Sequence, residues 1–537
     1  MLLHQEGVCW RVLPAGRAAI LVDAQAYFDA AKQAMLKARR SIHLLNWAFE
    51  PETRLDPHAG GGGGDEPVAD FLIRLAEARH DLDVRVLCWK SAMPVAATQN
   101  FFPLADRAAF AGTRVKFVLD GKLPSGACHH QKTIIVDNAV AFCGSGDFGP
   151  DRWDTPAHRD DDPRRQKSYR PKRDAKRKDL YFDSRHEVMG LVDGDAAAGL
   201  GDLFRRRWER CTGEALPRPE TIVPDVWPTC VTPNFTNVNV GLSRTEGAWR
   251  GDPEVRECEA LHLAAIAAAR HCIYMENQYY TSELMAAALA RRLAQPDGPE
   301  VVLVSTAQSP SFFDRATMDR TRWRFIDTLQ AADRYRRFRI YSPVTALGRI
   351  IVVHAKLTIV DDVLIRIGSA NLNNRSTGFD TECDLTIECG EPDDAAARGT
   401  IRGLRTGLLA HWLGCADDVV ETAVARAGSV AGGLEALRDA GHCRLRPITT
   451  HALGPVSAVI AGLHLGDPVG SWDGGRPWRR KRAIARRLAA AGLIASKPVS
   501  PDHRRLTASA HESPPPEGDG PTPSVTPRQT AFAPTRP

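Results

Sequence analysis

One pattern of residues occurs twice in this chain, and it constrains the fold more than any other feature. His130-Gln131-Lys132 is followed by Asp137 and then by Gly144-Ser145-Gly146-Asp147. The pattern returns, at a constant offset of 224 positions (354 minus 130), as His354-Ala355-Lys356, Asp361 and Gly368-Ser369-Ala370-Asn371. Both copies read H-x-K-x4-D-x6-G-S-x-[DN] without a gap. Two matches in register indicate that the chain contains two similar halves.

The sequence before each copy alternates helical and apolar segments. Residues 30–40 have a helical pattern and lead into the apolar segment 41–47, and residues 261–270 lead into 272–277 in the same way. Alternating helices and buried strands are typical of α/β folds. We therefore expect two similar α/β/α halves. Each would have a mixed, largely parallel sheet flanked by helices, and the halves would pack with pseudo-two-fold symmetry.

The repeat also sets the expected domain boundaries. The first half, with the first motif, would span residues 1–225, and the second, with the second motif and appended helices, residues 226–445. Residues 446–537 are expected to be irregular, basic at first and then rich in proline, with a disordered tail from Lys497 onward. Gly60 to Gly64 is expected to be a linker, because the Lys-Ser/Thr pair of a phosphate-binding loop does not follow it.

Composition excludes several classes of protein. With 43% hydrophobic and 25% charged residues, the 537-residue chain is ordinary globular material and not collagen or coiled coil. The 70 basic and 65 acidic residues leave a net charge of +5, which does not by itself indicate nucleic-acid binding. No apolar run reaches the roughly 18 residues of a membrane span, and we see no secretory signal. The 12 cysteines lack CxxC spacing, which favours reduced thiols in the cytoplasm.

Each motif places a histidine and a lysine two residues apart at the start of a strand-like run. Strand side chains at this spacing share a face, so His130 and Lys132 point together. Asp137 and Asp361 fall in turn sequences, seven residues after the motif histidine. Seven extended residues span about 23 Å at about 3.3 Å each, so the aspartate can hardly contact its own motif's histidine. We therefore expect Asp137 and Asp361 to be structural turn residues.

Packing the two halves together would gather two imidazoles and two ammonium groups around one pocket. This set suits phosphoryl-ester chemistry, in which one neutral histidine attacks phosphorus and the other, protonated, donates to the leaving oxygen. The charged and polar groups expected to hold the phosphate oxygens are Lys132, Lys356, Asp147, Asn371, Ser145 and Ser369. Because the lysines supply the positive charge that a metal ion would bring, we expect no metal and no cofactor.

The double motif resembles the HKD signature of the phospholipase D superfamily. Residues 128–137 are similar to the first motif of eukaryote-type phospholipases D, and residues 353–362 with 367–376 are similar to the second. Residues 273–280 resemble a segment between the two motifs in the same branch. Weaker agreement comes from Arg152-Trp153-Asp154 and His411-Trp412-Leu413-Gly414. The resemblance covers about residues 15–415.

The resemblance implies catalytic roles. The family forms a phosphohistidine intermediate and passes the phosphatidyl group to water or to a primary alcohol. By similarity His130 would be the nucleophile and His354 the general acid, although the near-symmetric repeat leaves the reverse assignment open. An acidic residue downstream of each motif would orient an imidazole of the opposite half, and Glu187 and Glu382 occupy the matching places. Asp147 departs from the Asn of many first motifs and adds a carboxylate near the phosphate.

The leading functional prediction is a phospholipase D-type phosphodiesterase that cleaves glycerophospholipids such as phosphatidylcholine. The alternatives are a cardiolipin synthase-like phosphatidyltransferase, a nuclease of the same superfamily, and a binding protein without activity. We expect a phospholipid substrate, no nucleic-acid partner and a monomer. The chain begins almost directly with catalytic sequence, so we do not expect calcium-dependent recruitment through lipid-targeting modules.

Several other residues are candidates for lipid contact. The basic tract 164–178 holds nine Lys or Arg residues and could contact an anionic membrane surface or be a solvated loop. The tract 476–487 holds seven and, as a helix, could lie in a lipid interface, attract nucleic acid or be solvated. The aromatic residues that could line a substrate groove, or belong to the core, are Trp47, Trp89, Tyr279 and Tyr280. His129 is expected to be structural, and His43 and His158 have no assigned role.

Overall fold

Nearly all strands belong to one mixed sheet, whose strand order is almost the same when it is read from either end. The computed structural model describes residues 1–57, 66–91, 103–167, 180–219, 225–390, 394–441, 444–450, 454–470, 473 and 477–494. Over these residues the sixteen-stranded sheet has the order β18-β13-β12-β11-β15-β16-β17-β9-β1-β8-β6-β5-β2-β3-β4, and β10 pairs with β9. Outward from the central pair β9-β1, the two halves repeat the same succession of strands. This is the predicted pseudo-two-fold arrangement.

The corresponding strands of the two halves have similar lengths. The strands of the first half are β1 (Arg11–Val22), β2 (Ser41–Asn46), β3 (Asp83–Trp89), β4 (Lys116–Asp120), β5 (Thr133–Val136), β6 (Val140–Gly144) and β8 (Val188–Asp193). Those of the second are β9 (Phe235–Glu246), β11 (Cys272–Asn277), β12 (Glu300–Val304), β13 (Phe338–Pro343), β15 (Lys356–Val360), β16 (Leu364–Gly368) and β17 (Glu382–Glu388). The shorter strands are β10 (Val255–Arg256), β18 (Leu445–Pro447), β7 (Arg185–His186) and β14 (Val352–Val353).

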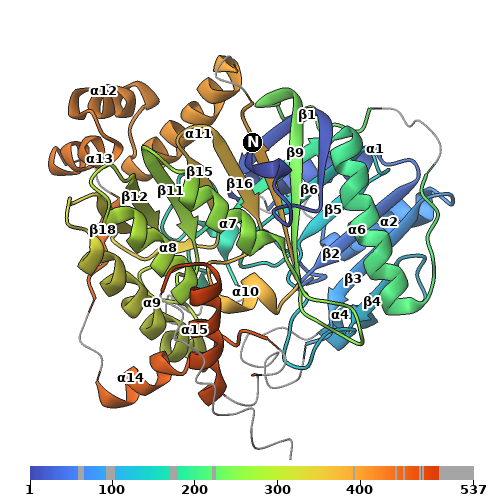
Figure 1. Ribbon diagram of the computed structural model, residues 1–537. Helices are drawn as coiled ribbons and strands as arrows, with labels where there is room; N and C mark the ends of the chain where they lie inside the picture. Colours follow the sequence, from blue (N-terminus) through green and yellow to red (C-terminus); the bar gives the residue numbers. More distant parts are fainter. Residues whose placement is uncertain are drawn as a thin grey trace, which may run out of the picture. The chain divides into compact units, whose positions relative to one another are not determined.

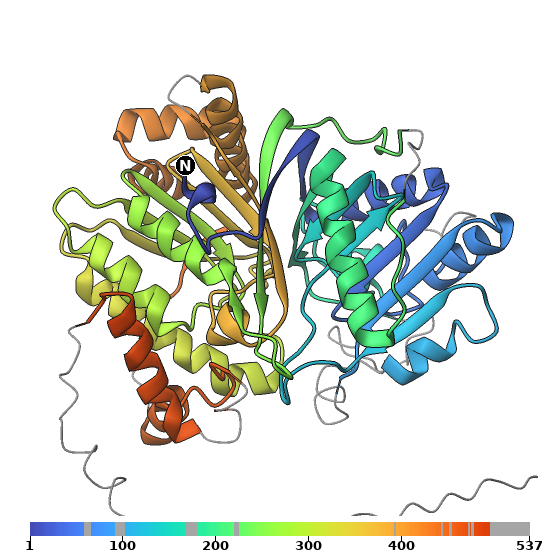
Figure 2. The same ribbon diagram turned by 45° about the vertical axis from the view of Figure 1, so that its right-hand side comes forward.

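The halves meet along the long antiparallel pair β1 and β9. This pairing runs from Arg11 opposite Leu242 to Ala18 opposite Phe235. Figure 2 shows the two strands at the seam, with the first half on one side and the second on the other. Because both strands have twelve residues, the seam is hydrogen-bonded over most of its length. The two halves therefore share one continuous sheet.

Parallel pairing is confined to the outer strands of each half and to β7-β14. The parallel neighbours in the main sheet are β2-β3-β4 and β11-β12-β13, and the pairs that include the motif strands β5 and β15 are antiparallel. The mixed α/β/α architecture is as predicted, but its parallel part is smaller than expected. The reason lies in the tight turns at Asp137-Asn138 and Asp361-Asp362, whose φ angles of +53° to +55° reverse the chain directly after each motif strand.

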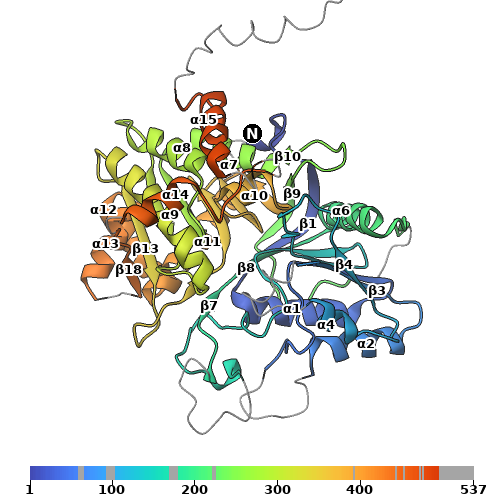
Figure 3. The ribbon, with the colours of Figure 1, turned by 90° about the horizontal axis from the view of Figure 1, so that it is seen from below.

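Helices cover both faces of the sheet in each half (Figures 1 and 3). The first half has α1 (Asp23–Lys37), α2 (Val68–Ala78) and α4 (Pro103–Ala108) on one face and α6 (Gly194–Thr212) on the other. The corresponding helices of the second half are α7 (Glu257–Ala268), α8 (Glu283–Leu293), α9 (Phe312–Ala332) and α11 (Ala395–Leu413). The remaining helices are α10 (Asn374–Gly378), α12 (Asp417–Ala427), α13 (Val430–Asp439), α14 (Pro455–Gly462) and α15 (Arg480–Ala490).

Apolar side chains from both halves form one shared core. The largest cluster joins Leu200 and Phe204 of α6 with Leu409 and Trp412 of α11, all of which are 0% exposed. The inner strands β2 and β11 are buried along their whole length, which explains why they read as continuous apolar runs. Each half keeps a second, separate cluster under its outer helices. The shared core fixes the two halves against each other and so positions residues that approach the seam from both sides.

The C-terminal part is more regular than the sequence indicated. Residues 1–494 form one compact unit, and α14 and α15 pack on α9 and α8 within a stretch expected to be irregular. The helical interpretation of residues 476–487 agrees with α15, whereas α14 was not predicted. The proline-rich tail and the Gly60 to Gly64 segment lie outside the described residues, and the boundaries at 225 and 445 stay predictions. No helix in the described part of the chain is long and apolar enough to span a membrane.

Candidate active site

The two motif histidines lie where the chain enters the central motif strands. Lys132 is the residue before β5 and His130 lies two residues earlier, while Lys356 is the first residue of β15 and His354 lies two residues before it. Contacts between the halves fix both segments: the His130 amide donates to the Thr381 carbonyl (3.1 Å), and the His354 amide donates to the His186 carbonyl (2.9 Å). The short pair β7-β14 is one of these contacts, and a bridge between His129 and Thr381 is its counterpart. Backbone pairing between the halves therefore positions each histidine.

Each motif imidazole contacts a carboxylate from the opposite half. His130 Nδ1 lies 2.8 Å from Glu382 Oε2, and His354 Nδ1 lies 2.9 Å from Glu187 Oε2. Both carboxylates are almost fully buried, at 0% and 1% exposure. A carboxylate at Nδ1 fixes the proton on that nitrogen and leaves Nε2 with its lone pair. The structure thus brings together two crossed His–Glu pairs, with Nε2 of each imidazole available for chemistry.

Ser145 and Ser369 contact these carboxylates, although the sequence predicted that they would bind the phosphate oxygens. The Ser145 hydroxyl donates to Glu187 Oε2 and the Ser369 hydroxyl to Glu382 Oε2, both at 2.5 Å. Each hydroxyl oxygen also accepts a backbone N–H at 3.0 Å, from Val188 and Cys383 respectively. Each Gly-Ser turn lies beside the strand next to the glutamate, so both hydroxyls form their hydrogen bonds within the protein. Their contacts position the glutamates.

The two lysines are buried beside the histidines. Lys132 Nζ donates to the His130 carbonyl (2.9 Å) and Lys356 Nζ to the His354 carbonyl (2.7 Å), and both side chains are at most 1% exposed. Lys132 also lies 3.4 Å from Asp147, which accepts the Trp47 amide at 2.9 Å. Burial and the nearby cations Lys132 and Arg152 lower the pKa of Lys356 well below its usual value. Asp147, the carboxylate that departs from the family pattern, is therefore the ion-pair partner of Lys132.

The surroundings of the imidazoles keep them neutral. Burial is the main cause that lowers the pKa of His130 and of His354 well below 6.5, and the adjacent lysines lower both further. Burial also raises the pKa of Glu382 to about 8, against hydrogen bonds from Ser369 and Ser376 that lower it. A neutral imidazole can act as a nucleophile. The arrangement also lets the His130–Glu382 pair hold a proton near neutral pH.

Asn371 occupies the place of Asp147 in the second copy. It is 3% exposed, and within the described residues its Oδ1 has no hydrogen-bond partner. Asn371 carries no charge, so Lys356 lacks the carboxylate that Lys132 has. The two otherwise similar sites therefore differ in charge.

The motif aspartates bind backbone amides far from the imidazoles. Asp137 accepts the amides of Arg39, Arg40 and Ser41 at 2.7–2.8 Å, and Asp361 accepts those of residues 270–272 at 2.6–2.8 Å. In each half the aspartate ties the turn after the motif strand to the loop before the neighbouring strand. These contacts match the structural role expected for them.

The aromatic residues considered for a substrate groove, and two further histidines, lie in different environments. Trp47 stacks on Trp89 with ring centroids 5.8 Å apart, and Lys132 Nζ lies 5.9 Å above the Trp47 ring. Tyr280 is in the core, and its hydroxyl donates to the Met275 carbonyl. Tyr279 donates to Asp314. His43 stacks on Phe204, and buried His129 lies 3.5 Å from Asp120.

The basic tract 164–178 lies mostly outside the described residues. Its first residues are held by acidic partners: Arg164 pairs with Asp162, and Arg165 pairs with Asp154 and is buried. These two arginines belong to the folded loop.

Sequence reasoning missed Arg152. Its Nη1 lies 3.4 Å from His354 Nε2 and 3.5 Å from Glu187 Oε1, and its side chain is 10% exposed. The only signal was the weak agreement of Arg152-Trp153-Asp154 with the family pattern.

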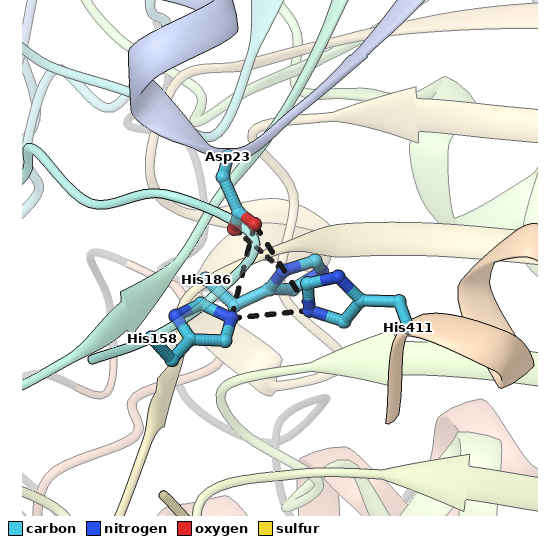
Figure 4. A group of neighbouring side chains, drawn as sticks. All are labelled: Asp23, His158, His186 and His411. Atoms are coloured by element: carbon cyan, nitrogen blue, oxygen red, sulfur yellow. Dashed lines mark hydrogen bonds and ion pairs between the residues drawn. The ribbon is translucent and has the colours of Figure 1, made fainter. Parts of the chain in front are cut away.

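A second group of side chains, next to the active site, has the donor atoms of a metal site (Figure 4). Asp23, His158, His186 and His411 each present one atom, and these atoms lie within 4.8 Å of one another. His158 Nε2 is 3.1 Å from His411 Nε2 and 3.8 Å from Asp23 Oδ2, and His186 Nδ1 is 2.8 Å from Asp23 Oδ1. Asp23 Oδ2 has no hydrogen-bond partner in the described part of the chain.

Two of these histidines are oriented by further carboxylates. His158 Nδ1 contacts Asp154 and His186 Nε2 contacts Glu276, each at 2.8 Å. Imidazole ligands backed by carboxylates are typical of zinc and similar ions. These residues could hold such an ion, against the expectation of no metal. The sequence gave no signal because the donors come from four separate segments.

The chain is similar to known proteins over much of its length. Residues 262–396 match the family model "Cardiolipin synthase, PLD-like domain". "Phospholipase D A" of Dictyostelium discoideum is 24% identical over 68% of this chain and 32% of its own length. "Phospholipase D alpha 1" of Carica papaya is 23% identical over 72% of this chain and 63% of its own length. These matches support a protein of the phospholipase D superfamily. It spans only about one to two thirds of the length of these curated relatives.

Solved structures resemble this chain more distantly. Phosphatidylserine synthase of Haemophilus influenzae aligns with 73% of this chain and 87% of its own, with 12% identity and a TM-score of 0.47. The phospholipase D family member Nuc of Salmonella typhimurium aligns with 32% of this chain and 90% of its own, with a TM-score of 0.21.

Proposed function

We propose that this superfamily member is a phospholipase D-type phosphodiesterase acting on glycerophospholipids such as phosphatidylcholine. It would release the headgroup and form phosphatidic acid, or a phosphatidyl ester when an alcohol is the acceptor. The observation that carries the proposal is the pair of crossed His–Glu contacts with a buried lysine beside each histidine. Relatives named phospholipase D support this choice of substrate.

The geometry supports a two-step reaction. In the first step Nε2 of His130 attacks phosphorus, and the positive charge that develops on its ring is stabilised by Glu382 at Nδ1. His354 is neutral in the empty site, but a phosphodiester anion bound beside it favours its imidazolium form. That imidazolium donates its Nε2 proton to the leaving headgroup oxygen. In the second step His354 takes a proton from water or an alcohol, which then displaces the histidine from phosphorus.

The lysines would stabilise the transition states. As phosphorus becomes five-coordinate, negative charge grows on the non-bridging oxygens, and Lys132 and Lys356 supply fixed positive charge in a site from which water is largely excluded. Their hydrogen bonds to the histidine carbonyls hold the ammonium groups in place before substrate arrives. Such preorganised charge typically contributes several kcal/mol to catalysis.

A phosphatidyltransferase is the second candidate. The matching family model carries the name cardiolipin synthase, and the chemistry differs only in using a lipid alcohol as the acceptor. A nuclease remains the third alternative from the sequence.

We infer that any membrane contact through the second basic tract is electrostatic. Ala483 and Ile484 of α15 are buried against the chain, so its apolar face is not available for insertion. Lys481, Arg482 and Arg486 are exposed, and Trp478 beside them is 65% exposed. Such a surface attracts anionic lipid in a salt-dependent way.

The test of the proposed activity measures headgroup release. Vesicles of phosphatidylcholine or phosphatidylethanolamine are incubated with the full chain, with and without ethanol, and with a lipid alcohol in a third series. Choline or ethanolamine release with phosphatidylethanol formation supports the phospholipase. Product only with the lipid alcohol moves the assignment to the transferase. Loss of single-stranded DNA, with no lipid product, moves it to the nuclease.

The variants H130A and H354A should abolish the reaction. The exposed His80→Ala, which is remote from both motifs in sequence, is the matched control and should keep wild-type activity.

A further inference from the structure

Arg152 makes the two ends of the active site unequal. The offset of 224 that relates the motifs places Ser376 at the position of Arg152 in the second copy. The fold supports this equivalence nearby, since Phe148 bridges to Phe49 and its counterpart Leu372 bridges to Tyr280. Arg152 lies between Glu187 and His354, whereas Ser376 hydrogen-bonds to Glu382 beside His130. A guanidinium therefore faces one imidazole, and only a hydroxyl is present at the other end.

The contact between Arg152 and His354 occupies the ring nitrogen that the reaction needs. A guanidinium has donors only, so His354 Nε2 must face it with a lone pair while Nδ1 carries the proton toward Glu187. In the reaction that same Nε2 must face the substrate oxygen. Arg152 thus lies where the leaving oxygen and the phosphoryl group meet His354.

The guanidinium is loosely held compared with its buried neighbour Arg185. Arg152 reaches its partners at 3.4–3.5 Å: His354, Glu187 and Asp151. Arg185 has the same side-chain exposure of 10%, yet it holds Asp151 at 2.6 and 3.0 Å. Charged N–H···O contacts are usually 2.7–2.9 Å, and in the described part of the chain no hydrogen bond engages Nη2 of Arg152. Arg185 is anchored by two short hydrogen bonds to Asp151, whereas Arg152 has only long contacts and keeps donors for a ligand.

The charges around the site favour an anion at this end. Lys132 is neutralised in part by Asp147, but the second copy has uncharged Asn371 at that place. Arg152 is close enough to Lys356 to lower the pKa of that ammonium group. Two buried cations that repel each other are stabilised when an anion binds between them.

We propose that Arg152 is a phosphate-binding residue of the active site that donates to a non-bridging oxygen at the His354 end. The planar fork of a guanidinium matches the oxygens of a phosphoryl group. The inference rests on the proposed function only for the identity of the substrate, because any phosphoryl group would bind in this way. It also gives a physical reason why the two histidines, related by the repeat, do not act interchangeably.

The test measures binding of inorganic phosphate to the full chain by calorimetry, in the absence of any phospholipid. R152Q should weaken phosphate binding at least tenfold, or about 1.4 kcal/mol. R152K keeps a charge near Glu187 and Asp151 but lacks the fork, so it should fold normally and bind with intermediate affinity. The matched control is R205Q, which removes a buried arginine that pairs with Asp202 in α6. It should bind like the wild type.

Phospholipid turnover by the same variants tests the proposed substrate separately from the proposed role of Arg152. Binding that depends on Arg152 without any lipid hydrolysis by the wild type overturns the proposed substrate and leaves this inference standing. Lipid hydrolysis with the same kcat/KM in wild type and R152Q overturns the inference and leaves the proposed function standing. No phosphate binding by the wild type, or equal affinity in wild type, R152K and R152Q, also overturns it. Melting temperatures establish that each variant is folded.

Discussion

The turn aspartates allow the structural and chemical parts of the motif to be separated. Asp137 accepts three backbone N–H groups at 2.7–2.8 Å and is 3% exposed. Hydrogen bonds to charged groups contribute about 1.5–3 kcal/mol each. Arg39 and Arg40 are exposed, so water can replace part of this loss when the side chain is removed. We therefore expect D137A to lower the free energy of unfolding by roughly 4–6 kcal/mol.

Unfolding of the compact 494-residue unit should have an entropy of about 1 kcal/mol/K. D137A should thus lower the melting temperature by roughly 4–6 °C. D137N keeps an acceptor oxygen and tolerates the positive φ of +53°, so its loss should be smaller, about 1–2 kcal/mol. The assay is calorimetry together with kcat measured well below the transition. The exposed turn residue Asp81, replaced by Ala, is the control.

Because Asp137 contacts the loop before β2 and not an imidazole, kcat of the folded variants should stay within about threefold of wild type. A hundredfold loss of kcat with an unchanged melting temperature would refute the structural role.

Three further predictions follow from the site. E382Q removes the carboxylate that stabilises the imidazolium of His130 and should lower kcat about a hundredfold with KM nearly unchanged; wild-type turnover would contradict the crossed pairing. Since burial and the lysines lower the pKa of His130 well below 6.5, protonation should remove this nucleophile only below that pH, so kcat/KM should not decline as the pH falls to 6.5. An acidic limb at or above 6.5 would be inconsistent with this. Zinc at a hundred times its Kd should stabilise the chain by about 2.7 kcal/mol, and H411A should lose that effect; an equal rise in both melting temperatures would exclude a role for His411.

Much of the fold followed from local sequence patterns. The repeated motif, the continuous apolar runs of β2 and β11 and the helical segment before β2 each reflect contacts within a short stretch of chain. The proportion of parallel pairing was overestimated, because the sequence pattern of buried strands does not by itself show that the Asp137-Asn138 turn reverses the chain into β6.

The site was harder to predict where it depends on distant residues. The His–Lys spacing identified the chemistry, and family resemblance pointed to Glu187 and Glu382. The positioning contact of Ser145 needs the adjacency of the β6 turn and β8, which only the folded sheet provides. Asp23 and His411 are separated by almost the whole folded chain, so no spacing rule could connect them.

The most direct test of the account is to trap the covalent intermediate. The full chain is mixed with a phospholipid carrying ³²P in its phosphodiester group, denatured in alkali within milliseconds and digested for peptide mapping. The account predicts one alkali-stable, acid-labile phosphohistidine, on His130, absent from H130A and accumulating in H354A if the leaving group is good enough to depart without a proton. Rapid headgroup release with no labelled histidine in any variant would contradict it.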